Sequence, residues 1–223
     1  ISFVGNPLVD TVRAELPPEE ARRHFGITDG EVPILLMPGS RREEIERLLP
    51  AMLGAAEILF AADPARRFFL PVAGSVLKER VQEIIASSGM TVTLTYDARY
   101  ALMGIARAAM AASGTVVMEA AIMGLPAVVL YRMSALSYFV GRLLVDVPRF
   151  SLPNILLGET FETELLQDEV QPERIADEME RILADGAARA HIIQRLARAV
   201  ELLGAPHAAR RVAEKIIALA ERR

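Results

Sequence analysis

Short apolar runs alternate with longer stretches of helical period between Thr28 and Tyr131. Each apolar run is too short to bury itself as a helix, and the residues that follow it place apolar side chains three or four positions apart. This alternation is typical of a parallel sheet wrapped by helices. The predicted strands are Ile34–Met37, Phe68–Val72, Val92–Thr95, Ala109–Ala112 and Ala127–Tyr131.

The first long helix of this region is predicted to begin near Arg41. Its apolar residues keep the spacing of a single buried face, and its opposite face is charged. The buried face consists of Ile45, Leu48, Leu49, Met52, Leu53, Ala56 and Leu59. Further helices are predicted over Leu77–Ser87, Ala98–Ala106 with Asp97 as its N-cap, Thr115–Met123 and Ala135–Val145.

After Pro153 the pattern predicts helices alone, over Pro172–Ala184, Ala187–Leu203 and His207–Arg222. The first of them has proline in its first turn, where its missing N–H costs nothing. The other two carry apolar stripes that need a partner surface. Three surfaces could cover them: the sheet of this domain, an absent domain or a second subunit. The stripes are Ile192, Leu196, Val200 and Leu203 in one helix, and Val212, Ile216 and Leu219 in the other.

These patterns predict an α/β fold with a doubly wound, Rossmann-like parallel sheet and extra carboxyl-terminal helices. We divide the chain into an interdomain segment (1–27), a Rossmann-like domain (28–155) and a helical extension (156–223). The opening sequence ISFVGNPLVD is typical of a buried strand that runs into a turn. We therefore expect a further domain before Ile1.

Composition narrows the classes of function. With 223 residues, 52% of them hydrophobic, the chain has material for one sizeable core. The net charge of −4 gives no global basic field, which argues against nucleic acid as a partner. There is no cysteine, and the three histidines are scattered, so we expect no metal and no cofactor. No apolar run approaches the roughly 20 residues that span a bilayer.

The first stretch that could carry chemistry is LLMPGSRREEIERL, where a buried strand turns into the long helix. Ligands of open α/β sheets bind at the carboxyl ends of strands, and helix N-termini offer free amides to phosphate. Gly39 and Ser40 would let the backbone approach a diphosphate, and the Arg41 guanidinium would hold it. The alternative is a plain strand–helix turn whose Arg41 and Arg42 pair with Glu44 and Glu46.

The second stretch is MAASGTVVMEAAIMGLPAVVLYR. Glu119 is the only charged residue between Ala108 and Tyr131. A carboxylate in so apolar a helix is costly without donors, and two ribose hydroxyls would supply them. The turn Ser113, Gly114 and Thr115 before it offers amides to phosphate. The alternative is that Glu119 caps backbone amides or points to solvent.

The third stretch is YRMSALSYFVGRLLVDVPRFSLPNIL. Arg132 follows a strand, and Asn154 lies in a turn fixed by proline, where its amide could hydrogen-bond a ligand. Between them lies an amphipathic pattern that fits either lipid contact or a core helix.

Taken in order, FVGNPL, LLMPGSRREEI, ASGTVVMEAAIMGLPAVVLYRM and FSLPN resemble the carboxyl-terminal half of lipid-A-disaccharide synthases, over nearly the whole chain. The resemblance implies the carboxyl-terminal domain of a GT-B glycosyltransferase. That enzyme would transfer 2,3-diacylglucosamine from UDP to 2,3-diacylglucosamine 1-phosphate, with inversion. Its implied location is the cytoplasmic surface of the inner membrane.

By resemblance, Arg41 holds the diphosphate, the turn Ser113 to Thr115 lines its pocket, and Glu119 takes the ribose hydroxyls. Arg132 and Asn154 would border the sugar and phosphate. The family usually has Gly-His-Pro where this chain has Gly5-Asn6-Pro7, which puts any role of that histidine in question. The acceptor site, the catalytic carboxylate and the membrane contact are implied for the preceding domain.

We therefore predict one half of an enzyme, which binds the UDP-sugar donor without a metal ion, while the catalytic base lies in the other half. The expected partners are its own amino-terminal domain, the lipid acceptor and a second copy of the chain bound through the terminal helices. Two alternatives stay open. One is another UDP-N-acetylglucosamine enzyme of this architecture, a 2-epimerase or a muramyl-peptide glucosaminyltransferase. The other is a non-catalytic nucleotide-binding or assembly module.

Overall fold

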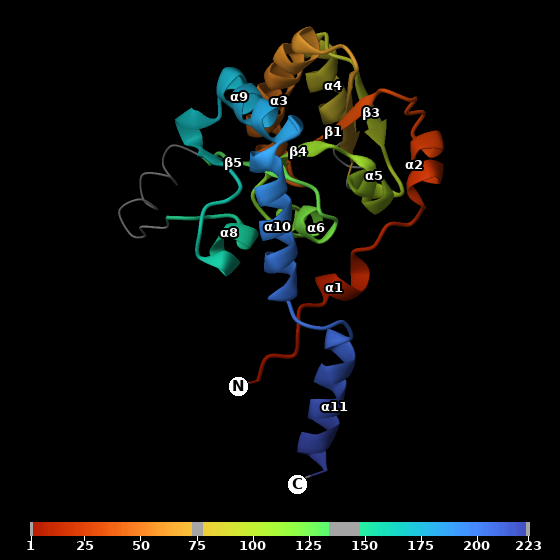
Figure 1. Ribbon diagram of the computed structural model, residues 1–223, viewed down its shortest axis with the longest axis vertical. Helices are drawn as coiled ribbons and strands as arrows, with labels where there is room; N and C mark the ends of the chain where they lie inside the picture. Colours follow the sequence, from red (N-terminus) through yellow and green to blue (C-terminus); the bar gives the residue numbers. More distant parts are fainter. Residues whose placement is uncertain (1, 73–77, 134–147, 222–223) are drawn as a thin grey trace.

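A six-stranded parallel sheet forms the centre of the computed structural model, which describes residues 2–72, 78–133 and 148–221 (Figure 1). The strand order is β3-β2-β1-β4-β5-β6, and the order reverses its direction between β1 and β4. The strands are β1 (Val32–Met37), β2 (Arg66–Pro71), β3 (Val92–Thr95), β4 (Ala108–Ala112), β5 (Ala127–Tyr131) and β6 (Glu164–Leu166). The predicted α/β, doubly wound fold class is confirmed, and all five predicted strands are present.

Helices cover both faces of this sheet, as the connection of parallel strands requires. They are α1 (Leu8–Thr11), α2 (Pro18–His24), α3 (Arg42–Ala62), α4 (Lys78–Ser88), α5 (Arg99–Ile105), α6 (Thr115–Ile122), α8 (Leu152–Leu157), α9 (Pro172–Leu183), α10 (Ala187–Glu201) and α11 (Ala208–Ala220). The predicted helix Ala135–Val145 lies outside the described residues. No helix in the described ranges combines the length and apolar character that crossing a membrane requires.

Alternate residues of the central strand β1 enter two separate cores. Ile34 and Leu36 pack with the apolar faces of α3, α4 and α9. Leu35 and Met37 pack on the other face with α2, α5 and part of α6. The seven apolar residues predicted for the buried face of α3 are all buried, which confirms the 3.6-residue pattern. The sheet is thus held rigidly from both sides, and its carboxyl edge carries the loops.

Two local predictions are wrong. Asp97 does not cap α5, which begins after Ala98 in a left-handed conformation and has no side-chain cap of its own; Asp97 instead contacts His24 Nε2 at 3.2 Å. The segment after Pro153 is not helical throughout, because β6 pairs with β5 and a 3₁₀ turn follows over Gln167–Glu169. With three residues, two of them only half-buried, β6 is too short for its pattern to distinguish a strand.

The first residues also differ from expectation. Residues 2–6 form no strand; residues 2 and 3 are exposed, and residues 4–6 are half-buried. They run beside the connection between α10 and α11, where the backbone N–H of Asn6 donates to the Leu203 carbonyl at 2.8 Å. The Asn6 side chain accepts from the Leu8 amide at 2.9 Å and so orders the start of α1. In this structure the Asn6 side chain therefore serves the local turn.

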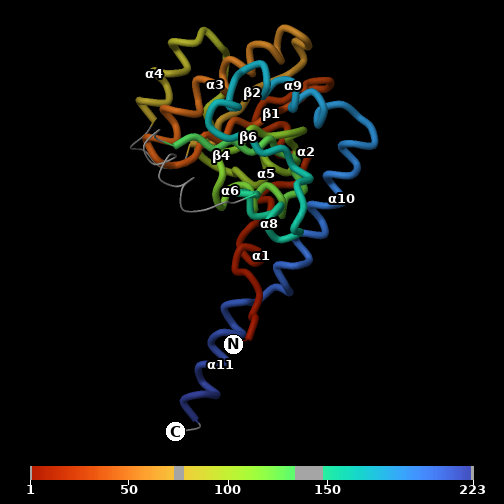
Figure 2. The backbone as a smooth tube through the Cα atoms, turned by 90° about the vertical axis from the view of Figure 1, so that its left-hand side faces the viewer, coloured from red at the N-terminus to blue at the C-terminus, as the bar shows by residue number. Residues whose placement is uncertain are grey.

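The two stripes of the last helices have different surroundings. In α10, Ile192 and Leu196 are buried in the main core, and the helix packs against α6, α8 and α9. Helix α11 extends away from the body of the domain (Figure 2), and the side chains of Ile216 and Leu219 are 62% and 65% exposed. Within the described residues, only the α10 stripe is covered by this domain.

Candidate functional site

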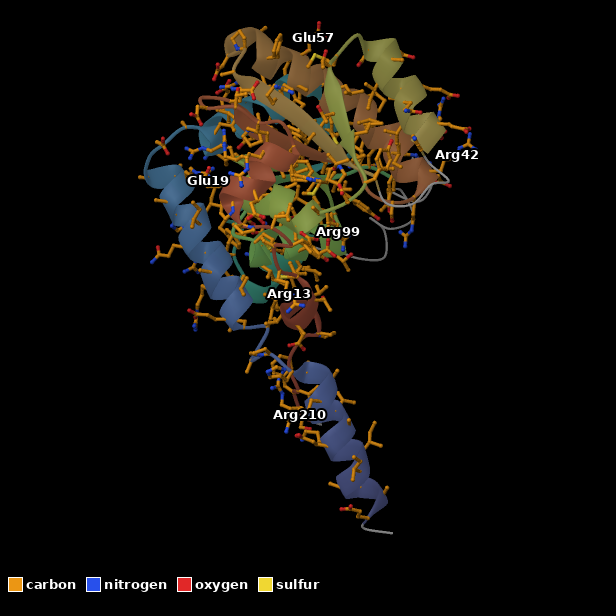
Figure 3. The ribbon with its side chains drawn as sticks, turned by 90° about the vertical axis from the view of Figure 1, so that its right-hand side faces the viewer. Arg13, Glu19, Arg42, Glu57, Arg99 and Arg210 are labelled. Atoms are coloured by element: carbon orange, nitrogen blue, oxygen red, sulfur yellow. The ribbon has the colours of Figure 1, made fainter. Side chains whose placement is uncertain are left out.

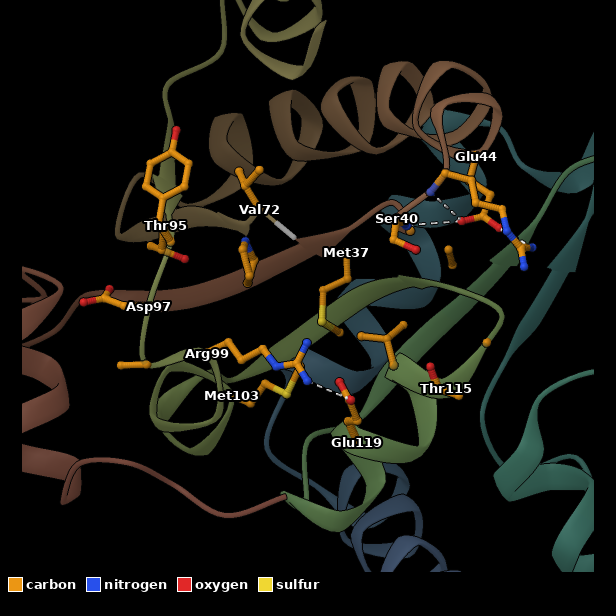
Figure 4. A pocket seen from close by; sticks show the side chains of 18 of the residues that line it. Met37, Ser40, Glu44, Val72, Thr95, Asp97, Arg99, Met103, Thr115 and Glu119 are labelled. Atoms are coloured by element: carbon orange, nitrogen blue, oxygen red, sulfur yellow. Dashed lines mark hydrogen bonds and ion pairs between the residues drawn. The ribbon is translucent and has the colours of Figure 1, made fainter. Parts of the chain in front are cut away.

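A cavity of about 760 Å³ opens at the carboxyl edge of the sheet. It lies where the strand order reverses, between the ends of β1 and β4, which is the place where open α/β sheets bind ligands. Loops after β1, β3 and β4 form its walls (Figure 4). Seven of the nine predicted site residues line it, namely Gly39, Ser40, Arg41, Ser113, Gly114, Thr115 and Glu119.

The turn after β1 is organised by Glu44, in the first turn of α3. One oxygen of its carboxylate, Oε2, accepts from the backbone amides of Ser40 at 3.2 Å and Arg41 at 3.3 Å. Gly39 has φ of +100°, and a Cβ there would lie 2.2 Å from Glu44 Oε2, so this position requires glycine. The amides that we predicted for a diphosphate are therefore already bonded to Glu44.

Arg41 reaches the cavity with a mostly free guanidinium. Its side chain is 83% exposed, and its Nη1 lies 3.2 Å from Glu44 Oε1. Arg42 pairs with Glu46 at 3.0 Å on the outer side of the helix. Both ion pairs of the alternative interpretation are present, yet only Arg41 lines the cavity. Exposed ion pairs of this kind stabilise a protein by only about 1 kcal/mol or less. Arg41 could therefore leave Glu44 and bind an anion at little cost in free energy.

The turn after β4 offers a second helix N-terminus. Helix α6 begins at Thr115 and has no side-chain cap, and Gly114, Thr115 and Val116 line the cavity. The Ser113 hydroxyl donates to the Phe150 carbonyl at 3.1 Å, which fixes the turn. Uncapped amides carry the positive end of the helix dipole. Helices α3, α5 and α6 all begin at this cavity. Glu44 accepts from amides at the start of α3, and Glu15 accepts from amides at the start of α5, so α6 is the best prepared of the three to receive an anion.

Glu119 lies one turn further along α6 and is 7% exposed. Its Oε1 accepts from Arg99 Nη2 at 3.0 Å and from the Tyr100 hydroxyl at 3.3 Å. Burial opposes the charge on Arg99, but the Tyr100 hydrogen bond and the Glu119 charge outweigh it and raise the pKa of the guanidinium. Glu119 is thus neither a backbone cap nor a solvent-exposed group; it is a buried carboxylate with side-chain donors.

Each acidic side chain at the cavity has a partner within the protein. Glu44 and Glu119 are paired with Arg41 and Arg99, and Asp97 contacts His24. Glu15, from the amino-terminal segment, accepts from the Ala101 amide at 2.7 Å. In the described residues no three His, Asp or Glu side chains form a group suited to a metal ion. The cavity therefore presents the Arg41 guanidinium and free amides to a ligand, while each of its acidic side chains already has a partner in the protein.

The remaining two predicted site residues lie elsewhere. The Arg132 guanidinium donates to the carbonyls of Gln167 at 3.2 Å and Val170 at 3.1 Å. Asn154 is fully buried, and its amide is saturated: it donates to the Glu162 carbonyl and to Glu164, and it accepts from two amides. The structure does not bring either residue to the cavity.

Sequence reasoning missed the wall formed by the end of β3 and the start of α5. Tyr96, Asp97 and Arg99 line the cavity there, together with Glu15. Their position after a predicted strand could have indicated this wall, because the residues that follow neighbouring parallel strands lie together at the carboxyl edge of the sheet. No sequence pattern around Glu15 indicates that it lies at the cavity, because the Ala101 amide from which it accepts is 86 residues away.

The family model for lipid-A-disaccharide synthetase matches residues 1–217. The chain belongs to this family. It is 40% identical over 213 residues to the lipid-A-disaccharide synthase of Geobacter sulfurreducens, covering 96% of this chain and 56% of the relative. It is 40% identical over 220 residues to that of Syntrophus aciditrophicus, covering 98% and 57%. The chain thus spans little more than half the length of these family members.

Solved structures share the fold at much lower identity. The UDP-N-acetylglucosamine 2-epimerase of Neisseria meningitidis, bound to UDP-N-acetylglucosamine, has a TM-score of 0.61 at 15% identity, covering 96% of this chain and 54% of its own. WaaG, a glycosyltransferase involved in lipopolysaccharide biosynthesis, has a TM-score of 0.53 at 13% identity, covering 88% and 50%. These likenesses establish the glycosyltransferase-type fold, whereas the family rests on the sequence match.

Proposed function

We propose that this chain is the donor-binding half of a lipid-A-disaccharide synthase and that its cavity holds the UDP of a UDP-2,3-diacylglucosamine donor. The observation that carries the proposal is the convergence of Arg41, the Ser113–Thr115 turn and Glu119 on one cavity, although they come from different elements. A diphosphate needs cations and free amides, and a ribose needs a carboxylate. This cavity offers all three.

The structure favours a particular placement within that cavity. The diphosphate would lie on the uncapped amides at the start of α6, since the corresponding amides of α3 are bonded to Glu44. Arg41 would reach it from the opposite wall, and Glu119 would take the ribose hydroxyls. The solved 2-epimerase with UDP-N-acetylglucosamine and the MnaA–UDP co-structure, relatives in fold, have uridine nucleotides as their ligands, which supports this choice of ligand class.

In the proposed reaction the acceptor hydroxyl of 2,3-diacylglucosamine 1-phosphate attacks the anomeric carbon with inversion, and UDP leaves. Negative charge grows on the leaving diphosphate, and Arg41 with the α6 amides would stabilise it without a metal. The base that deprotonates the acceptor would belong to the part of the family protein that precedes this chain. The complete enzyme would work at the cytoplasmic surface of the inner membrane, where its lipid substrates lie.

Calorimetric titration with UDP tests the binding step. We expect the chain to bind UDP, and Glu119→Ala and Arg41→Ala each to weaken binding about tenfold or more, because each removes a charge-assisted hydrogen bond. Arg42→Ala is the matched control, since Arg42 neighbours Arg41 but does not line the cavity. An unchanged affinity in both cavity variants, or no binding by the wild type, would refute the proposal.

The same preparation tests the division of labour. Incubated with UDP-2,3-diacylglucosamine and the acceptor, these 223 residues should form no disaccharide. Measurable product would show that the chain carries its own base and would overturn the proposed placement of the catalytic carboxylate.

A further inference from the structure

The two oxygens of the Glu119 carboxylate have different environments. Oε1 accepts both side-chain hydrogen bonds, from Arg99 at 3.0 Å and from Tyr100 at 3.3 Å. Among the described residues, Oε2 has no donor, and Glu119 lines the cavity. One oxygen is thus anchored by the protein, and the other is available to a ligand (Figure 4).

Arg99 and Tyr100 act as one unit. The Arg99 guanidinium lies over the Tyr100 ring, 4.6 Å from its centroid, and donates to the Tyr100 hydroxyl at 2.5 Å. Both residues come from the first turn of α5, so their backbone fixes where their side chains start. The stacked pair leaves the guanidinium little freedom to move relative to the ring.

The amino-terminal segment in turn holds the start of α5. This helix has no side-chain cap from its own preceding residues, and Ala98 before it is strained at φ of +46°. Glu15 supplies the missing acceptor to the amides of Ala101 at 2.7 Å and Tyr100 at 3.5 Å. A chain of contacts therefore runs from the amino-terminal segment through α5 to the Glu119 carboxylate.

We infer that Arg99 and Tyr100 are positioning residues for ribose recognition: they anchor Oε1 of Glu119 so that Oε2 faces the cavity in the orientation that accepts ribose hydroxyls. The inference rests on the proposed function and deepens it. An unanchored carboxylate would rotate about its last torsion, and fixing it on binding would cost conformational entropy. Arg99 also gives the buried carboxylate a cationic partner at 3.0 Å, in a setting where an unpaired charge would be expensive.

The inference predicts that loss of the anchor affects ribose recognition specifically. The probes are UDP and its 2′,3′-dideoxy analogue, which keeps the base and diphosphate but lacks both hydroxyls. For the wild type we expect UDP to bind about tenfold or more tightly than the analogue. In Arg99→Met and Tyr100→Phe this preference should shrink several-fold while the affinity for the analogue stays unchanged. Arg99→Lys, which keeps a charged donor, should restore part of it.

The alternative roles give different results. If Arg99 contacts the diphosphate or base directly, Arg99→Met will weaken UDP and the analogue equally, which would overturn the inference. Tyr100→Phe removes one oxygen and serves as the second test if Arg99→Met does not fold. If Glu119→Ala abolishes the preference but neither α5 variant changes it, the inference fails and the proposed function stands. If the wild type binds no UDP, both fail.

Discussion

Asn154→Ala should lower the free energy of unfolding by about 3–5 kcal/mol, which is a large part of the stability of a domain this size. Asn154 is fully buried. Its amide nitrogen donates to the Glu162 carbonyl at 2.9 Å and to Glu164 at 2.7 Å, and its oxygen accepts from the amides of Phe161 and Glu162. Alanine would leave the Glu162 carbonyl and the amides of Phe161 and Glu162 without their side-chain partner, whereas Glu164 Oε1 would keep the Ser151 amide as a donor.

Urea denaturation followed by circular dichroism measures this loss. Gln171→Ala is the matched control, because Gln171 is an exposed amide with one hydrogen bond, to the Asp168 carbonyl, and its loss should change stability by less than about 1 kcal/mol. A similar small effect at Asn154 would contradict its structural role. A folded Asn154→Ala protein that has lost UDP-sugar affinity would instead support the ligand role that the family resemblance implies.

Glu162→Gln should make the fold more resistant to alkaline pH. Glu162 is 1% exposed; its Oε1 accepts from the Ala127 amide at 2.9 Å, and its Oε2 has no partner among the described residues. Burial, with the nearby negative charge of Glu164, outweighs that hydrogen bond and raises the pKa of Glu162 from 4.5 to about 8. The folded protein therefore carries a neutral carboxyl here at pH 7.

The direction of the pH effect follows from this raised pKa. Between pH 4.5 and about 8 the folded state keeps a proton that the unfolded state releases, so stability falls as pH rises through this window and levels off above it. The loss is about 1.4 kcal/mol per pH unit at most, or about 2–3 kcal/mol between pH 6 and pH 9. Asp10 and Glu31 have lowered pKa values and titrate below this window.

Urea unfolding at pH 6 and pH 9 tests the prediction. The wild type should lose about 2–3 kcal/mol between the two conditions, and Glu162→Gln should lose clearly less, since the glutamine does not titrate. Glu57→Gln, on the exposed face of α3 (Figure 3), is the control and should behave as the wild type. Equal losses in the wild type and in Glu162→Gln would show that another group governs the alkaline side.

The sequence by itself determined the layered core and the edge that carries the site. Apolar runs and the 3.6-residue period are local signals, and they located the five strands and the buried face of α3. Because parallel strands end at a common edge, the turns after β1 and β4 had to lie together, and with them Arg41, the Ser113–Thr115 turn and Glu119.

Only the tertiary structure decided which polar groups become partners. Asn154 and Arg132 follow sequence patterns as suggestive as that of Glu119, yet their side chains bond to the segment around β6. Glu119 finds Arg99 from 20 residues away, and Glu15 caps a helix 86 residues later. A hydrogen bond depends on distances of about 3 Å, and such proximity between distant residues is set by the packing of whole elements, which no local pattern records.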